Sequence, residues 1–164
     1  MASTAMISAR LAPAALARLL ALGVPAALLG GAYLSQYAGG LHPCEMCYWQ
    51  RWPHFFALAV AALAFLFAAP SRNARLLTAL AALGIAVSGA IGVFHSGVEY
   101  GWWQGLTRCS SGGAMTLDEL MNVPLVRCDQ VQFSFLSVSM AGWNAILSLG
   151  SAAAVALLLR RADA

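Results

Sequence analysis

The sequence predicts an all-α membrane protein: a bundle of four transmembrane helices with two external loops, the second containing a short amphipathic helix. Composition, charge spacing and arginine placement carry this prediction. Of the 164 residues, 61% are hydrophobic and 9% are charged, and the mean hydropathy is +0.75. A typical soluble domain is about 45–50% apolar and about 25% charged, and so small a fold could not bury this much apolar surface. The composition therefore excludes a soluble enzyme and a disordered linker.

Four stretches without Asp, Glu, Lys or Arg follow one another along the chain, and each holds at least 20 residues. A membrane-spanning helix needs about 20 mainly apolar residues. We therefore expect a single integral membrane domain, 1–164, with spans at about 16–35, 51–69, 76–95 and 139–159 and external loops at about 36–50 and 96–138.

The arginines are distributed unevenly between the two sides of these spans. Six lie before the first span, in the short second loop or after the last span, namely Arg10, Arg18, Arg72, Arg75, Arg160 and Arg161. The other three, Arg51, Arg108 and Arg127, lie on the opposite side with five acidic residues. Because positively charged loops stay in the cytoplasm, we expect both termini to be cytoplasmic and both cysteine-bearing loops to be external.

The first span has an alternative interpretation as a cleavable signal peptide, because Arg18 precedes the apolar run 19–34. That run is long for the apolar region of a signal peptide, and no small-x-small cleavage site follows promptly. We therefore expect a retained span. Its removal would leave the other three spans oriented the same way.

Small and polar residues recur at helical spacing within the spans. Small residues occupy every fourth position in the first and third spans, at Gly23, Ala27, Gly31, Gly84, Ser88 and Gly92. This spacing lets helix backbones approach closely in lipid. On the fourth span Asn144, Ser148 and Ser151 form a polar stripe, which we expect to face inward and to serve helix packing.

All four cysteines fall in the predicted external loops: Cys44 and Cys47 end the first, and Cys109 and Cys128 lie in the second. Disulfides persist outside the bacterial cytoplasm, so four loop cysteines indicate two bridges. Four cysteines allow three pairings. Local pairing within each loop is the simplest, and the sequence leaves the others open.

The run Cys44-Glu-Met-Cys47 is a C-x-x-C motif at the outer start of the second span. A thioredoxin-type site would need a βαβ context, and covalent haem attachment would need His in place of Tyr48. A structural zinc site would need a second close-spaced pair, which Cys109 and Cys128 do not form. No metal is therefore expected.

The position of this motif favours thiol–disulfide exchange over a structural staple. Pro43 predicts that a helix starts here, and a helix N-terminus stabilises a thiolate. Arg51 lies one turn beyond Cys47, where it can stabilise a thiolate or a negative charge on a nearby acceptor, while Glu45 acts in the opposite direction. A bridge closing so short a loop adds little stability.

The second external loop has a different design. Cys109 lies in a Gly- and Ser-rich stretch, an exposed context that suits a thiol offered to a large partner. The run 116–119 (TLDE) resembles a capping box that opens the short amphipathic helix, which we expect on the membrane surface. Cys128 lies between Arg127 and Asp129. Taken alone, Cys109 and Cys128 are explained equally well as a structural disulfide across a long loop and as an exchanging pair. The presence of the C-x-x-C motif favours thiol–disulfide exchange.

Further runs extend the pattern: 42–51 (HPCEMCYWQR), 95–103 (HSGVEYGWW), 127–129 (RCD), 135–136 (FL) and 139–144 (SMAGWN). Together they resemble the DsbB family of bacterial disulfide bond formation proteins, over nearly the whole chain. The resemblance implies a multi-pass protein of the bacterial inner membrane with periplasmic cysteines. It would reoxidise a periplasmic DsbA-like dithiol protein of thioredoxin fold and pass two electrons to a membrane quinone, either ubiquinone or menaquinone.

The resemblance also implies roles for the cysteines. Cys44 and Cys47 would be the quinone-coupled pair. Cys109 and Cys128 would be the pair that meets the partner, with Cys109 taking the mixed disulfide. A transient bridge between Cys44 and Cys128 would join the two pairs.

Two further residues enter the site through the resemblance. Arg51 matches the quinone-binding arginine of the family. His95 aligns with a histidine near the quinone, and an interfacial histidine bonded to headgroups or water is the alternative. The chain departs from the usual family residues Glu, Glu, Trp and Gly at Gln50, Gln130, Phe133 and Ser137. These departures concern partner preference and quinone-site detail rather than the class of reaction.

Two other functions fit parts of the pattern. A non-enzymatic membrane scaffold would use both disulfides structurally. A carrier moving electrons outward would need cysteines accessible from the cytoplasm, and the sequence predicts none there. Besides the lipid bilayer, the expected partners are the dithiol protein and the quinone pool. Nucleic acid is not expected, because nine arginines and no lysine are too few for a phosphate-binding patch.

Overall fold

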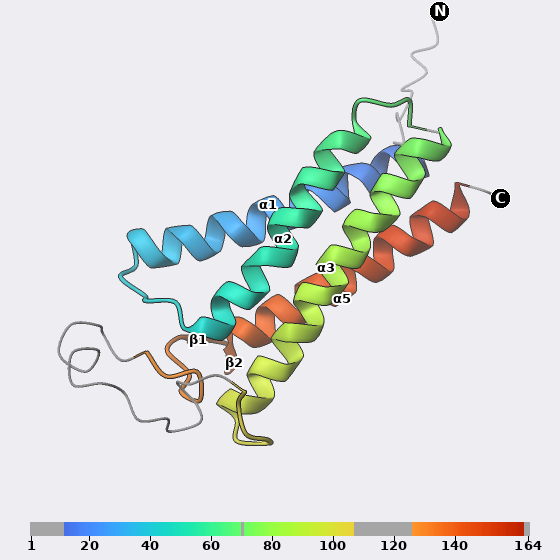
Figure 1. Ribbon diagram of the computed structural model, residues 1–164. Helices are drawn as coiled ribbons and strands as arrows, with labels where there is room; N and C mark the ends of the chain where they lie inside the picture. The colour runs from blue at the N-terminus through green and yellow to red at the C-terminus, as the bar shows by residue number, and fades with distance from the viewer. Residues whose placement is uncertain (1–11, 70, 107–125, 163–164) are drawn as a thin grey trace, which may run out of the picture.

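The computed structural model describes residues 12–69, 71–106 and 126–162, which form four long helices and one two-stranded hairpin (Figure 1). The helices are α1 (Pro13–Tyr37), α2 (Glu45–Ala64), α3 (Arg72–Glu99) and α5 (Met140–Arg161). The strands β1 (Ser134–Phe135) and β2 (Val138–Ser139) pair antiparallel just before α5. The start of α1 and the end of α5 lie at one end of the bundle, and the hairpin and the start of α2 lie at the other (Figure 1).

The predicted helical bundle is confirmed, with a helix at each of the four predicted positions. Of the described helices, α1, α3 and α5 are long and apolar enough to cross a membrane. α2 is shorter than expected, since it ends at Ala64 rather than near residue 69. Polar side chains in its first turns also lower its hydropathy, so a fourth span at α2 stays a prediction.

The outer surface of the bundle is apolar. Each helix exposes large hydrophobic side chains, such as Leu34 on α1, Phe56 on α2, Leu83 on α3 and Leu157 on α5. A soluble monomer rarely exposes apolar surface on every side, whereas lipid chains cover it without cost. The chain is therefore a membrane protein, as its sequence predicts.

Glycines on α3 allow close contact with its neighbours. A Cβ atom at Gly84 would lie 3.1 Å from a main-chain oxygen of α2, and one at Gly92 would lie 3.0 Å from a main-chain oxygen of α5. Between them, the buried Ser88 donates a hydrogen bond to the carbonyl oxygen of Gln50 at 2.8 Å. The predicted packing role of this row of small residues is confirmed.

The corresponding row on α1 behaves differently. Among the described residues, no neighbouring atom lies within 4 Å of a Cβ atom built at Gly23 or Gly31. The prediction of close helix approach at these glycines is therefore wrong. Ala27 and Gly31 instead line a cavity between α1 and the other helices, so the small side chains leave space there.

The polar stripe on α5 faces inward, as predicted. Ser148 is fully buried and donates to the side-chain oxygen of Asn144 at 3.0 Å, and Ser151 donates to the carbonyl oxygen of Ser148 at 3.0 Å. The Asn144 amide reaches across the bundle to α2 and α3. The stripe therefore joins three helices through hydrogen bonds.

The hairpin was not expected in the second external loop. Its two-residue turn places Leu136 (φ 50°) and Ser137 (φ 63°) in the left-handed region, as tight hairpins require. The Tyr100 hydroxyl donates to the carbonyl oxygen of Ser137 at 3.3 Å and accepts from the Ser139 N–H at 3.1 Å. The turn is thereby held between the end of α3 and the start of α5. The predicted amphipathic helix after residue 116 lies outside the described residues.

Candidate functional site

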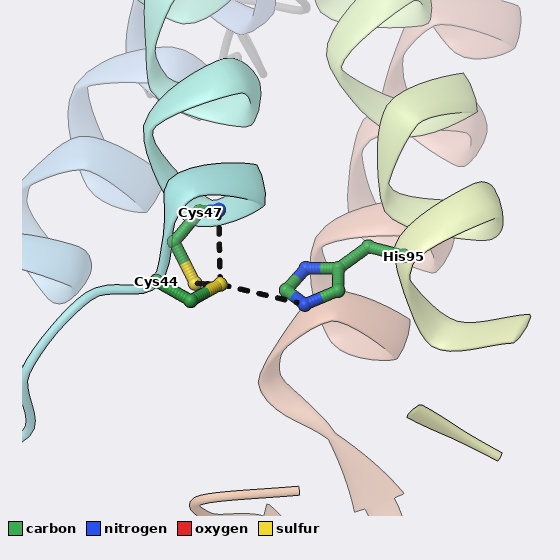
Figure 2. A group of neighbouring side chains, drawn as sticks. All are labelled: Cys44, Cys47 and His95. Carbon is green, nitrogen blue, oxygen red and sulfur yellow. Dashed lines mark hydrogen bonds between the residues drawn. The ribbon is translucent and has the colours of Figure 1, made fainter. Parts of the chain in front are cut away.

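The C-x-x-C motif lies at the N-terminus of α2, where the sequence predicts a helix start. Cys44 is the N-cap residue, and its sulfur accepts the N–H of Cys47 at 3.3 Å. The two sulfur atoms lie 3.0 Å apart (Figure 2). Cys44 is 3% exposed, so this sulfur is reached through the protein rather than directly from solvent.

His95 on α3 faces these sulfur atoms (Figure 2). Its Nε2 atom lies 3.5 Å from the sulfur of Cys44 and 3.8 Å from a carboxylate oxygen of Glu99. The imidazole is buried, with 2% of the residue exposed. The burial of the ring and its contact with the Cys44 sulfur favour a place within the site over the interfacial alternative.

Cys128 completes the group of sulfur atoms. It is fully buried and packs with Cys44, Met46 and Val98 in one cluster. Its thiol is also hydrogen-bonded with that of Cys44. The structure therefore brings one cysteine of the second loop to the C-x-x-C motif, whereas Cys109 lies outside the described residues.

Hydrogen bonds between the sulfur atoms shift the pKa values of the two C-x-x-C thiols in opposite directions. The pKa of Cys44 is raised, first by its hydrogen bonds with Cys128 and Cys47 and then by burial. The pKa of Cys47 is lowered, chiefly because the Cys44 thiol hydrogen-bonds to its sulfur. The first proton is therefore lost from Cys47, while Cys44 keeps its own.

Arg51 lies one turn further along α2, and it is 8% exposed. Its guanidinium donates to the side-chain oxygen of Gln36 at 2.7 Å and to the carbonyl oxygen of Ala32 at 3.4 Å. It also lies over the rings of Tyr33 and Tyr48, at 4.9 and 5.2 Å from their centroids. Within the described part of the chain Arg51 forms no ion pair with a carboxylate. Its charge is available to an anion.

A cavity of about 300 Å³ joins these groups. Side chains from α1, α2, α3 and α5 line it, and they include Cys44, Cys47, Arg51, His54, His95 and Asn144. The volume is that of a small ligand site. The thiols of the C-x-x-C motif and a buried cation therefore line the same cavity.

The ion pair of the second loop lies at the edge of this cavity. Arg127 lines it and binds both carboxylate oxygens of Asp129, at 2.9 and 2.6 Å. The hydrogen bond with Arg127 lowers the pKa of Asp129, and the same contact raises the pKa of Arg127. The pair joins the two side chains that flank Cys128.

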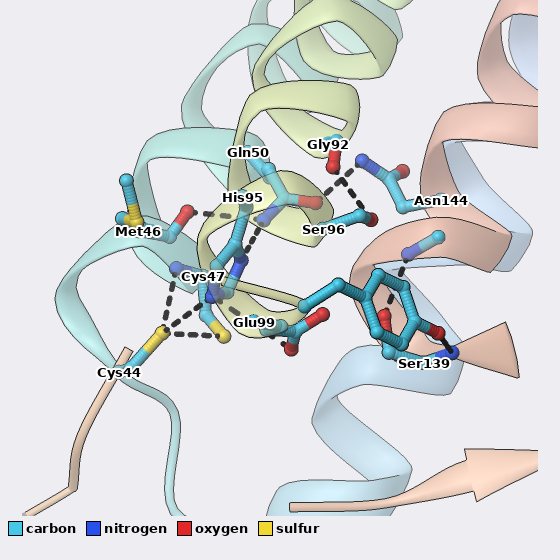
Figure 3. A network of polar contacts seen from close by, with 12 residues as sticks. Cys44, Met46, Cys47, Gln50, Gly92, His95, Ser96, Glu99, Ser139 and Asn144 are labelled. Carbon is cyan, nitrogen blue, oxygen red and sulfur yellow. Dashed lines mark hydrogen bonds and ion pairs between the residues drawn. The ribbon is translucent and has the colours of Figure 1, made fainter. Parts of the chain in front are cut away.

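A polar network lies directly behind the thiols (Figure 3). Gln50 contacts Nδ1 of His95 at 2.8 Å and the amide nitrogen of Asn144 at 2.8 Å, and Asn144 in turn contacts Nε2 of His54 at 2.9 Å. The sequence analysis did not assign Gln50 or His54 to the site. One indication was present, since both are polar, lie four residues apart and interrupt an apolar run.

The three donor atoms of Cys44, Cys47 and His95 lie within 4.8 Å of one another, a grouping that a thiophilic metal could use. Two thiolates on a tetrahedral zinc ion lie about 3.8 Å apart, as follows from Zn–S bonds of about 2.3 Å. The observed sulfur separation of 3.0 Å is shorter. This spacing suits chemistry between the sulfurs better than a metal between them.

Comparison with known proteins places this site in a family. A family model described as disulfide bond formation protein DsbB matches residues 14–158. Disulfide bond formation protein B of Methylococcus capsulatus is 34% identical over 139 residues, which cover 76% of this chain and 81% of the relative. Uncharacterized protein RP370 of Rickettsia prowazekii is 22% identical over 129 residues, 74% of this chain and 73% of the relative. No solved structure matches the chain.

Proposed function

The chain belongs to the DsbB family of disulfide bond formation proteins, and from that premise we propose that it is a protein-dithiol:quinone oxidoreductase. It reoxidises a DsbA-like dithiol protein in the periplasm and passes two electrons to a membrane quinone. The observation that carries the proposal is the gathering of Cys44, Cys47 and Cys128 beside a cavity that also holds Arg51.

The contact between Cys128 and Cys44 supplies a route for exchange. A thiolate of the partner attacks the sulfur of Cys109 in a bridge between Cys109 and Cys128, and Cys128 leaves as a thiolate. That thiolate attacks Cys44 in the bridge between Cys44 and Cys47. A bond between Cys44 and Cys128 forms, and the electron pair goes to Cys47 as a thiolate. Each step is a direct displacement at sulfur, and the lowered pKa of Cys47 makes it a good leaving group.

The residues around the cavity fit a quinone headgroup. A quinone supplies an acceptor for two electrons and two protons. The guanidinium of Arg51 is buried and has no carboxylate partner among the described residues, so it stabilises negative charge in the cavity. His95 supplies a second polar contact, and apolar surface of Ala27 and Leu28 covers the remainder.

The location follows from the same chemistry. A quinone with an isoprenoid tail stays in lipid, so thiols that react with it belong at the membrane edge. The start of α2, which carries the C-x-x-C motif, and the hairpin between Cys128 and α5 lie at the bundle end opposite the start of α1 and the end of α5 (Figure 1). We assign that end to the periplasmic face of the bacterial inner membrane, because most arginines lie at the other end.

Quinone reduction in proteoliposomes tests this proposal. The full chain is reconstituted with ubiquinone or with menaquinone, a reduced DsbA-like protein is added, and quinone absorbance is followed. We expect reduction by the wild type and at least a hundredfold loss for Cys47→Ser. The variant Thr78→Val is the control, because among the described residues the side-chain hydrogen bond of this buried threonine stays within its own helix. Equal rates for the wild type and Cys47→Ser with both quinones would reject the proposal.

Labelling of thiols in cells separates this function from a structural scaffold. An alkylating reagent added after respiratory inhibition should trap Cys44 and Cys47 as free thiols, since their electrons then have no acceptor. Two structural disulfides would stay oxidised under the same treatment. That outcome would favour the scaffold and contradict the oxidase.

A further inference from the structure

The side-chain amide of Gln50 has one orientation in the buried network (Figure 3). Its nitrogen lies 3.2 Å from the carbonyl oxygen of Met46 and 2.8 Å from Nδ1 of His95. Its oxygen lies 2.8 Å from the amide nitrogen of Asn144. A carbonyl oxygen only accepts hydrogen bonds, so the Gln50 atom facing Met46 is the NH₂ group, which donates.

The amide of Asn144 is fixed in the same way. Its nitrogen lies 3.2 Å from the carbonyl oxygen of Ser88 and 3.2 Å from the hydroxyl of that residue. The Ser88 hydroxyl already donates its proton to the carbonyl oxygen of Gln50. Both Ser88 atoms therefore accept, and the Asn144 nitrogen donates to them and to the oxygen of Gln50. Reversing the Gln50 amide would place its oxygen against the Met46 carbonyl oxygen, and reversing the Asn144 amide would place its oxygen against the Ser88 carbonyl oxygen.

These fixed amides determine where His95 carries its proton. The Gln50 nitrogen donates, so Nδ1 of His95 accepts and bears no proton in the neutral ring. The proton of the ring is then on Nε2, which faces the sulfur of Cys44 at 3.5 Å. The carboxylate of Glu99, 3.8 Å from Nε2, favours the proton at the same atom.

The contacts of His54, at the other end of the network, agree with these orientations of the two amides. The oxygen of Asn144 faces Nε2 of His54 at 2.9 Å and therefore accepts a hydrogen bond from its N–H. A neutral His54 then has a bare Nδ1 atom, and this buried atom has no hydrogen-bond partner among the described residues. Two backbone carbonyls, those of Met46 and Ser88, thus set the orientation of the chain Gln50–Asn144–His54.

We propose that Gln50 is a positioning residue that locks His95 as the Nε2–H tautomer, so that His95 donates to the sulfur of Cys44 and leaves the Cys44 proton directed at Cys47. The role of this His95 tautomer in catalysis rests on the function proposed above. The resulting chain runs from His95 Nε2–H to the Cys44 sulfur, and from there to the Cys47 sulfur at 3.0 Å and to the Cys128 thiol, the other hydrogen-bond partner of Cys44. Successive hydrogen bonds strengthen one another, so the chain stabilises a thiolate on Cys47.

The opposite tautomer would break this chain. A bare Nε2 would accept the Cys44 proton, and the Cys47 thiolate would lose its donor. In the locked state the reduced pair carries one negative charge, on the Cys47 sulfur, because Cys44 retains its proton. The fully reduced pair is therefore ready to react without a base.

The substitution Gln50→Glu reverses the lock. A carboxylate has no proton to donate to His95, so it accepts from Nδ1–H and leaves Nε2 bare. The side chain keeps nearly the same size, and one oxygen still accepts from Asn144, while the hydrogen bond to the Met46 carbonyl is lost.

Nitrogen NMR of the wild-type protein tests the tautomer directly. The full chain, labelled with ¹⁵N-histidine, is reduced and measured in bilayers at pH 8, and the signals of His95 are those lost in His95→Gln. We expect a protonated Nε2 and a bare Nδ1 in the wild type, and the reverse in Gln50→Glu. A protonated Nδ1 in the wild type would overturn the proposal. No quinone or partner is present, so this outcome is independent of the proposed oxidase activity.

The rate of Cys47 alkylation tests the consequence for the thiols. Reduced protein is treated with iodoacetamide across a pH series, and modification of each cysteine is read by peptide mass spectrometry. A hydrogen bond to a charged group corresponds to about one pH unit. We therefore expect the Cys47 midpoint to rise by about one unit in Gln50→Glu and to stay unchanged in Thr78→Val. An unchanged midpoint in Gln50→Glu, with its tautomer reversed by NMR, would overturn the link to Cys47.

Discussion

Arg51 donates a hydrogen bond from Nη1 to Oε1 of Gln36 at 2.7 Å, so an uncharged amide at the end of α1 fixes the direction of a buried cation on α2. A carboxylate at position 36 would have neutralised that cation. The amide instead orients the guanidinium and leaves its positive charge for the cavity. This relationship makes α1 part of the candidate site, although α1 carries none of the four cysteines.

Arg51→Gln should weaken quinone binding without blocking thiol exchange. Loss of one charge-assisted contact corresponds to a reduction in apparent quinone affinity of about 10- to 100-fold. Oxidation of the dithiol partner in a single turnover should keep its rate, because the sulfur atoms are untouched. Quinone titration and a stopped single-turnover assay measure the two steps. Arg160→Gln, at the far end of α5, is the control, and equal losses in both assays would make Arg51 structural.

Cys44→Ser should raise the pKa of Cys47. The hydrogen bond from Cys44 is the largest cause that lowers the pKa of Cys47 below the ordinary thiol value of 9.0, and a serine hydroxyl on a shorter bond reaches less far. At pH 7 to 8 the Cys47 thiolate fraction, and thus its alkylation rate, should fall severalfold. Above pH 9 the rates of the two proteins should converge. A faster reaction in the variant at pH 7 would contradict this account.

Gly92→Ala should destabilise the bundle, whereas Gly23→Ala should not. A Cβ atom at Gly92 would lie 3.0 Å from main-chain atoms of Ala141 and Ala145, which cannot move away alone. Overpacking of this kind costs about 1–3 kcal/mol. Gly23 has open space, so alanine there should be neutral or stabilise α1 by up to about 1 kcal/mol. Thermal unfolding in detergent compares the two variants, and similar loss in both would refute the packing argument.

Ser137→Gly should stabilise the hairpin. Ser137 has φ 63°, a conformation that costs about 1–2 kcal/mol for a residue with a Cβ atom. Glycine adopts it without that cost, so the free energy of unfolding should rise by about 1 kcal/mol, with slower proteolysis near residue 136. Ser134→Gly, within β1, serves as the matched control and should show no gain.

Cys44 and Cys128 should form a disulfide readily when they are left as a pair. In the double variant Cys47→Ser with Cys109→Ser, mild oxidation should bridge them, because their thiols are already hydrogen-bonded. Mass spectrometry of unreduced peptides identifies the bridge. In Cys44→Ser with Cys109→Ser, the remaining pair should react more slowly. Equal rates in both variants would place Cys128 no closer to one cysteine than to the other.

Local sequence patterns were sufficient for the helices and for the first turn of α2. Stretches without charge located all four helices, and Pro43 marked the helix start that makes Cys44 an N-cap. The inward stripe containing Asn144 and Ser148 followed from helical spacing alone. These features depend on residues within one or two turns of each other.

The remaining features depend on contacts between distant parts of the chain. Gln50 meets residues 45 and 94 positions away, at His95 and Asn144, and no local pattern encodes such a meeting. The hairpin turn contains Leu136 and Ser137, neither of which favours a left-handed backbone. Contacts with Tyr100 hold it in place. Tertiary structure therefore overrides turn chemistry there.

The polarity of α2 has a consequence for biogenesis. Gln50, Arg51 and His54 follow one another within two turns of this helix, and an arginine alone costs up to about 3 kcal/mol inside a bilayer. Their partners lie on α1, α3 and α5, so some become available only after the ribosome has delivered later segments. We expect the insertion machinery to retain α2 until its neighbours emerge and to release the helices as a group.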